Sequence, residues 1–143
     1  MNVAGLLRPP PQTLRASAGL LILRAFAGYA FMVHGWGKIQ KPFTWGDSMG
    51  IPAFFQGLAP LAEFGGGLAW ILGLLTPIAS LGLLCTMAVA TWTLMVKHQV
   101  PLFPQGPAGS AELPVLFFCV AALLLLAGPG RFSADARLFR EKP

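Results

Sequence analysis

The sequence predicts an all-α membrane protein whose four transmembrane helices pack as one bundle. Hydrophobic residues make up 55% of the 143 residues and charged residues only 10%, whereas a soluble domain carries about 25% charged residues. Four long apolar runs follow one another along the chain. Each run is continuously apolar rather than alternating, which favours helices over the strands of a membrane barrel. The lipid bilayer is therefore the expected solvent for most of the surface.

The four runs have the lengths and punctuation of transmembrane helices. A helix needs about 20 residues to cross ~30 Å of hydrocarbon, and the fourth run is the shortest, so we expect it to tilt little or to thin the bilayer. Pro77 suits the first turn of the third helix. Pro60 should kink the second helix unless that helix begins there, which leaves 52–60 open between a helical, a re-entrant and an interfacial segment. The predicted spans are about 17–37, 54–75, 77–96 and 112–127.

Basic residues predict the orientation. We divide the chain into a membrane domain, 17–130, and two tails, 1–16 and 131–143. Lysine and arginine prefer the cytoplasmic flanks of a membrane protein, and the tails hold more of them than the loops between the spans. An even number of spans puts both termini on one side, so we expect both in the cytoplasm. The net charge of +5 then faces anionic headgroups, not nucleic acid. The basic residues of the tails are Arg8, Arg15, Arg131, Arg137, Arg140 and Lys142, and those of the loops are Lys38, Lys41 and Lys97.

A stripe of small residues predicts how the second helix packs. Small side chains let helix backbones approach closely, which is how helices associate in lipid. We therefore expect this face to contact neighbouring helices. It comprises Ala62, Gly65, Gly66, Gly67, Ala69 and Gly73.

Ionisable residues at membrane depth are the candidate functional groups. Each costs about 2.5–3.5 kcal/mol on insertion scales, so such residues mark functional sites by default. Threading the spans in alternating directions puts a polar group from every helix in the outward half of the bundle and leaves Arg24 in the inner half. The outward candidates are His34, Lys38, Glu63, His98 and Glu112.

Several chemistries fit the outward group. His34 and Glu63 could form a buried histidine–carboxylate pair, and with His98 they could ligate a metal. The same groups could bond to a quinone carbonyl and carry its protons. Structural alternatives stay open: Glu63 could bond to backbone groups freed by Pro60, the histidines could meet headgroups or solvent, and Arg24 could snorkel or bond to a carbonyl.

Two further features bear on the site. The first loop, 38–53, contains Phe43, Trp45 and Met49, and we expect it to fold back over the bundle or to lie in the membrane interface. Cys85 and Cys119 lie inside the third and fourth runs, outside any CxxC motif. We interpret them as small buried apolar residues rather than as a redox pair.

Six short motifs occur in a fixed order along the chain. They are LRAFAG at 23–28, VHGWGK at 33–38, GIPAF at 50–54, AEFGGG at 62–67, LGLLTP at 72–77 and GPGRFS at 128–133, with Asp135 following. Their order and spacing, over roughly 17–138, resemble those of the DoxX-like family of small bacterial membrane proteins. The first-helix histidine and second-helix glutamate of that family match His34 and Glu63.

The resemblance implies a four-helix protein of the bacterial plasma (inner) membrane that is associated with oxidoreductase systems. We therefore expect a membrane subunit or accessory protein of a respiratory or thiol-redox system, partnered by another membrane or redox protein. Whether it is an enzyme stays open: we do not expect activity from the chain alone, and an active protein would be a quinone-linked oxidoreductase subunit. Quinone or a metal ion is its expected ligand. The candidate binding residues are His34, Glu63, His98, Arg24 and Lys38, and the candidate metal ligands are His34, Glu63 and His98.

Two other functions remain open from the residues alone. A non-enzymatic scaffold or assembly factor would bind another membrane protein through the glycine-rich face. A small-molecule or proton transporter would require a homo-oligomer, because one four-helix unit has no evident inverted repeat.

Overall fold

The computed structural model describes residues 10–104 and 109–139, and every regular element within these ranges is helical. The all-α fold class is therefore confirmed. Arg8, Arg140 and Lys142, which contributed to the predicted orientation, lie outside the described residues. The elements are α2 (Leu14–Ile39), the 3-10 turn η1 (Asp47–Met49), α3 (Ala53–Pro60), the π-helical turn η2 (Leu61–Gly65), α4 (Gly66–Leu72), α5 (Thr76–Trp92), the π-helical turn η3 (Thr93–Lys97), α6 (Glu112–Ala127) and α7 (Ala134–Leu138).

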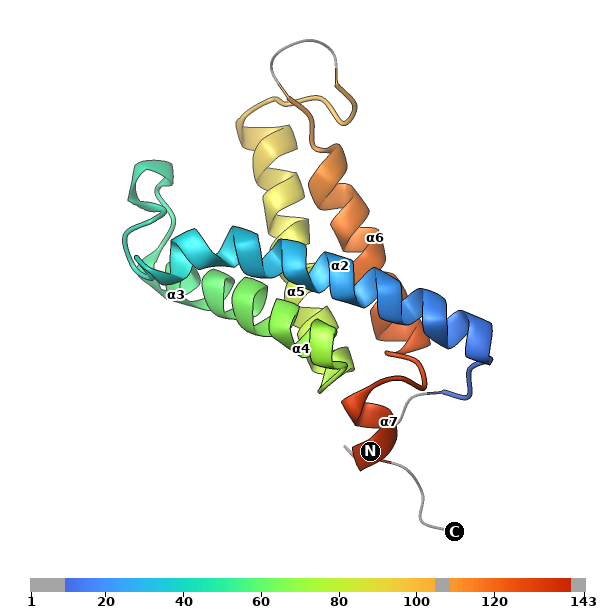
Figure 1. The fold of residues 1–143 in the computed structure, drawn as a ribbon. Helices are drawn as coiled ribbons and strands as arrows, with labels where there is room; N and C mark the ends of the chain where they lie inside the picture. Colours follow the sequence, from blue (N-terminus) through green and yellow to red (C-terminus); the bar gives the residue numbers. More distant parts are fainter. Residues whose placement is uncertain (1–9, 105–108, 140–143) are drawn as a thin grey trace, which may run out of the picture.

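The helices form two antiparallel pairs (Figure 1). In the first pair, α3, η2 and α4 continue one another beside α2, and in the second pair α5 lies beside α6. The two pairs cross, with α2 passing over α5 and α6, so that their ends diverge. Two stretches, Leu14–Ile39 and Thr76–Lys97, are long and apolar enough to cross a membrane, and α6 is apolar but shorter.

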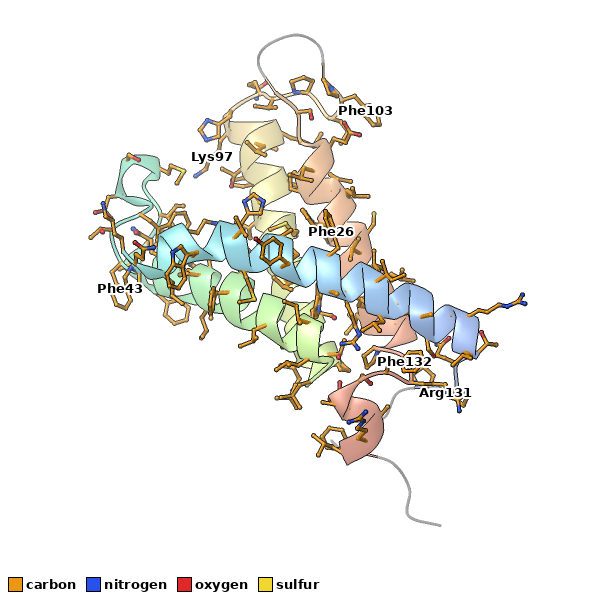
Figure 2. All side chains as sticks on the ribbon, in the orientation of Figure 1. Phe26, Phe43, Lys97, Phe103, Arg131 and Phe132 are labelled. Carbon is orange, nitrogen blue, oxygen red and sulfur yellow. The ribbon has the colours of Figure 1, made fainter. Side chains whose placement is uncertain are left out.

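The outward faces of these helices are apolar. On α2 the side chains of Ile22, Phe26 and Tyr29 are exposed, and Figure 2 shows Phe26 pointing away from the helix. Large exposed apolar side chains also occur along α5 and α6. A surface of this kind suits contact with lipid rather than with water.

Pro60 is accommodated by a change of helix type. Proline has no N–H, and its ring clashes with the carbonyl four residues earlier. α3 ends at Pro60, and Leu61–Gly65 form the π-helical turn η2 before α4 begins at Gly66. Residues 53–72 are thus helical throughout, without a break at the proline. Turns of this type are frequent at functional sites, and η2 contains Glu63.

Glycines bring α2 and α4 into backbone contact. A Cβ atom on Gly28 would lie 2.5 Å from the carbonyl oxygen of Gly67, and one on Gly67 would lie 2.5 Å from the carbonyl oxygen of Gly28. On the α5 side, a Cβ atom on Gly66 would lie 3.1 Å from Leu83. Gly66 and Gly67, two of the small residues of the second predicted span, therefore lie on its packing face.

An aromatic core joins the two pairs. Phe31 of α2 meets Trp70 of α4 edge to face, with ring centroids 5.4 Å apart, and meets Phe117 of α6 at 4.8 Å. Such pairs contribute about 0.5–1.5 kcal/mol beyond their burial. The buried indole N–H of Trp70 donates to the hydroxyl of Ser80 on α5 at 3.0 Å. Each helix of the two pairs thus contributes to one core.

The segment after α6 closes the end at which α4 turns into α5. Buried Arg24 of α2 donates to the carbonyls of Trp70 and Ile71, each at 2.8 Å, and to that of Phe132. Buried Asp135 of α7 accepts from the backbone N–H groups of Leu75 at 2.7 Å and Thr76 at 2.9 Å. The cation thus meets the carbonyl end of α4 and the anion meets the amide end of α5, as helix dipoles favour. We call this pair the Arg24–Asp135 clamp.

The clamp holds a turn of unusual backbone conformation. Gly73 has φ +64° and Leu75 has φ +49°, and the left-handed region costs a non-glycine residue roughly 1–2 kcal/mol. The carbonyl of Gly73 accepts from the backbone N–H of Asp135 at 2.9 Å. A Cβ atom on Gly73 would lie 2.5 Å from Arg24 Nη1. The turn therefore requires glycine at this position and the clamp around it.

We predict that Gly28→Ala destabilises the protein and that Gly37→Ala does not. The added Cβ atom at position 28 must separate α2 from α4, and overpacking of this kind costs about 1–3 kcal/mol. No atom lies within 4 Å of the corresponding Cβ position at Gly37, and alanine favours a helix over glycine by about 1 kcal/mol. Thermal unfolding in detergent measures both variants. Equal midpoints for the two would contradict the backbone contact.

We also predict that Asp135→Asn lowers the free energy of unfolding by about 1–3 kcal/mol, since the two backbone donors at the start of α5 lose a charged acceptor. Arg137→Gln is the matched control, because Arg137 is exposed on the same short helix. Thermal unfolding and limited proteolysis of the segment after α6 would measure the effect. A native-like Asp135→Asn variant would show that the clamp does not stabilise the fold.

Candidate functional site

Lys38 and Glu63 form an ion pair toward the C-terminal end of α2. The ammonium lies 2.6 Å from Glu63 Oε1 and 2.8 Å from Oε2. The Glu63 side chain is only 4% exposed, while that of Lys38 is 30% exposed, so Lys38 covers the carboxylate on its open side. Arg24 is 14 residues earlier on α2, roughly 21 Å along the helix axis. The ion pair and the clamp are therefore separate features.

A third glycine of α2, Gly35, allows Lys38 to reach Glu63. A Cβ atom on Gly35 would lie 2.8 Å from the backbone nitrogen of Phe64 and 3.1 Å from Glu63 Cβ. The missing side chain thus lets the backbone of α2 approach η2 beside Glu63. Lys38 follows Gly35 by three residues and lies on the same helix face. Its flexible stem then places the ammonium on the carboxylate.

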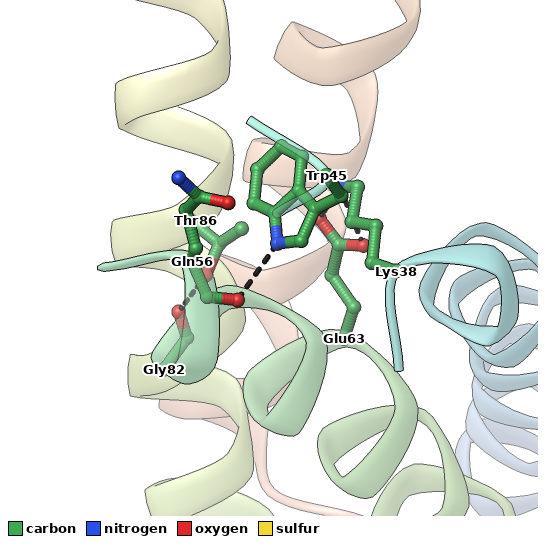
Figure 3. A network of polar contacts seen from close by, with 6 residues as sticks. All are labelled: Lys38, Trp45, Gln56, Glu63, Gly82 and Thr86. Carbon is green, nitrogen blue, oxygen red and sulfur yellow. Dashed lines mark hydrogen bonds and ion pairs between the residues drawn. The ribbon is translucent and has the colours of Figure 1, made fainter. Parts of the chain in front are cut away.

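Trp45 covers the ammonium from the loop between α2 and α3, as Figure 3 shows. The Lys38 ammonium lies 4.8 Å from the centroid of the Trp45 ring, in cation–π geometry. The indole N–H donates to the carbonyl of Gln56 at 2.7 Å. We call residues 41–52 the Trp45 loop. It folds back over the helix ends, one of the two arrangements expected from its sequence.

The side chain of Gln56, on α3, holds this loop. Its Oε1 atom accepts from the backbone N–H of Gly46 at 2.9 Å, and its Nε2 atom donates to Asp47 Oδ1 at 2.8 Å and to the carbonyl of Ile51 at 2.7 Å. Gln56 is 1% exposed. Sequence reasoning missed this residue, although an amide inside the apolar stretch AFFQGLAP was an available signal.

The arrangement can donate a hydrogen bond, accept one and exchange a proton. A lysine ammonium has three donors, and the two oxygens of Glu63 engage it from one side. Away from bulk water such a pair interacts strongly. A ligand with a carbonyl or hydroxyl group could bond to both partners once it reached them, and proton transfer between such groups is ordinary acid–base chemistry.

The other predicted site residues do not join this pair. His34 is exposed on α2, and His98 and Glu112 are exposed at the far end of the α5–α6 pair. Among the described residues, no three His, Cys, Asp or Glu side chains lie close enough to hold a metal, so the set of His34, Glu63 and His98 is not assembled. The predicted cluster required four helices that lie side by side, whereas the two helix pairs cross and their ends diverge. Figure 2 shows the result, with Lys97 and Phe43 at separate ends of the molecule.

Arg24 takes the structural role that the sequence left open. Its guanidinium is buried and donates to three backbone carbonyls. Its Nη1 atom is bonded to the end of α4 and its Nη2 atom to the segment after α6.

The cysteines and the groove between α5 and α6 lie outside the ion-pair site. Cys85 and Cys119 are free and exposed, so the prediction that both are buried is wrong, because these positions face outward from the α5–α6 pair. An open groove of about 390 Å³ contains none of the candidate ionisable residues. It is lined by Ala88, Thr91, Trp92, Met95, Val96, Val115 and Phe118.

Comparison with known proteins gives consistent relatives. The DoxX family model matches residues 19–96. Inner membrane protein YqjF of Escherichia coli is 34% identical over 128 residues, covering 87% of this chain and 94% of that protein. Putative oxidoreductase CatD of Bacillus subtilis is 29% identical over 87% of this chain and 90% of that protein.

A third relative, uncharacterized membrane protein Rv3486 of Mycobacterium tuberculosis, is 30% identical over 96% of this chain and 94% of that protein. No solved structure matches the chain. The family match covers more than half of the residues and includes both members of the ion pair. The chain therefore belongs to the DoxX family of membrane proteins.

Proposed function

We propose that this protein is a membrane subunit or accessory protein of an oxidoreductase system in the bacterial inner membrane. Two relatives support the proposal by name, one as an inner membrane protein and one as a putative oxidoreductase. The observation that carries it is the Lys38–Glu63 ion pair, a hydrogen-bonded and largely buried pair of charges among apolar helices. Charges in such a place are expensive and mark functional sites.

In this proposal each antiparallel pair contributes two spans. The stretch 53–72 contains 20 helical residues, roughly 30 Å at 1.5 Å per residue, which equals the hydrocarbon thickness. α6 has 16 residues, roughly 24 Å, and would thin the bilayer locally. Four spans put both termini on the same side, and the basic tails favour the cytoplasm.

The ligand of the ion pair in this proposal is a quinone headgroup. A quinone takes up two electrons and two protons, and the partner redox protein would supply the electrons. Lys38 would donate a hydrogen bond to the ligand carbonyl, and Glu63, which accepts from the same ammonium, would take part in proton exchange beside it. The Trp45 ring lies over the ammonium, and a flat ligand ring would take its place there when the loop moves. These residues thus fit a planar ring that carries oxygen acceptors.

We predict that Lys38→Met and Glu63→Gln each weaken the binding of a short-chain ubiquinone analogue by about tenfold or more, which corresponds to ~1.4 kcal/mol. The physical reason is the loss of the donor or of the charge that orients it. Titration of the full chain in nanodiscs, followed by tryptophan fluorescence, measures the dissociation constant. Lys41→Met is the matched control, because Lys41 is an exposed lysine near the same helix end.

Other outcomes would redirect the proposal. Loss of binding in His34→Ala with native binding in Lys38→Met would restore the site predicted from the sequence. Failure of the native protein to bind the analogue, together with recovery of a stoichiometric membrane partner, would favour the scaffold function.

A further inference from the structure

The carboxylate of the ion pair is closed to a ligand, while the side chain of Lys38 stays 30% exposed. Two oxygens of Glu63 engage the Lys38 ammonium, and the Trp45 ring covers it at 4.8 Å. Of the three donors of an ammonium, two are bonded to the carboxylate, and the Trp45 ring lies over the group. The Glu63 side chain is only 4% exposed. A ligand therefore bonds to Glu63 only if Lys38, and the Trp45 ring over it, move aside.

The part of the loop that contains Trp45 is a compact unit. The backbone N–H groups of Met49 and Ile51 donate to the carbonyl of Gly46 at 3.0 Å and 3.2 Å, and that of Gly50 donates to Asp47 at 3.1 Å. Gly50 has φ +65°, which allows the chain to turn there. With so many internal bonds, residues 45–51 can move as one piece.

That compact unit is fastened to the helices at one residue. Four hydrogen bonds join it to Gln56: three to the side chain, and one from the Trp45 indole N–H to the Gln56 carbonyl. Elsewhere in the Trp45 loop, Phe43 lies against Gly57, where a Cβ atom would be 2.8 Å from the Phe43 ring. The polar attachment of the unit is therefore concentrated at Gln56.

We propose that the Trp45 loop is a lid over the Lys38–Glu63 pair, and that Gln56 is the positioning residue that holds it closed. Entry of the ligand requires the loop to leave Lys38, and the bonds to Gln56 set the closed population. The role of the lid rests on the proposed function, because the ligand that the lid admits is the one that the ion pair binds. Its closed state, however, is measurable without any ligand.

Chemical labelling of Lys38 tests the lid directly. The full chain in nanodiscs is treated with a small amine-reactive reagent, and the rate at each lysine is obtained by mass spectrometry. We expect Gln56→Leu, which removes the side-chain bonds at similar volume, to raise the Lys38 rate by about tenfold, equivalent to ~1.4 kcal/mol of lost closed state. Trp45→Ala should raise it as well. Lys97, exposed at another end of the molecule, should react at an unchanged rate.

The matched control is Gln99→Leu. Gln99 is an exposed glutamine whose amide donates to Val96 in a different loop, so its loss should leave the Lys38 rate as in the native protein. Hydrogen exchange distinguishes an open lid from general unfolding. We expect faster exchange in 43–51 of the Gln56→Leu variant and native exchange in α5. An unchanged Lys38 rate in both Gln56→Leu and Trp45→Ala would overturn the lid.

General unfolding of the Gln56→Leu variant would appear as faster hydrogen exchange in α5. The Trp45→Ala variant would then decide by itself: a native labelling rate of Lys38 in that variant would overturn the lid. Failure of the proposed function is a separate result. A native protein that binds no quinone analogue, yet shows the expected labelling, would keep the lid and reject the ligand.

Discussion

Backbone contact between α2 and its antiparallel neighbour is the constraint on which the rest of the structure depends. Gly28 and Gly35 are seven residues apart on α2, two helical turns on one face, and each lies where a Cβ atom would collide with the backbone opposite. Between helices in lipid there is no hydrophobic driving force, so close packing must stabilise the association. Because Gly35 lies beside Glu63, the contact that holds the pair together also creates the ion-pair site.

The fold contains two solutions to the problem of a charge among apolar helices. The two terminal nitrogens of Arg24 bond to carbonyls at the end of α4 and after α6, for which the planar, many-donor guanidinium is well suited. Lys38, a compact charge on a flexible stem, is satisfied by a carboxylate instead. The Arg24 bonds join backbone segments far apart in the sequence and leave little for a ligand. The Lys38 pair joins two side chains, one of them partly exposed, and can exchange partners.

The sequence predicted the helices and the family well, but it predicted the site only in part. The fourth apolar run was placed at 112–127, where α6 (Glu112–Ala127) lies, because helix ends follow from local signals such as Gly128. Glu63 was identified by its charge within an apolar run. Its partner was assigned to His34, one turn from Lys38, because sequence periodicity does not reveal the π-helical turn at Leu61–Gly65. The crossing of the two pairs, which separates His98 from Glu63, depends on packing between distant segments. Gln56 was missed because its role lies in hydrogen bonds to an irregular loop.

The two ends of α2 and α4 differ in how firmly they are held. Around the clamp, hydrogen bonds donated by Arg24 and accepted by the side chains of Asp135 and Ser17 join the N-terminal half of α2, the turn after α4 and the segment after α6. Opening that end would break bonds between several segments at once. At the ion pair, the covering loop is bonded chiefly to its own chain neighbours and to Gln56, a few residues further on. Segments with few long-range contacts open at lower free energy than the core. We therefore expect the Trp45 loop to move at the ion pair, where the buried charge can bind a ligand. The clamp keeps the helices in register at the other end.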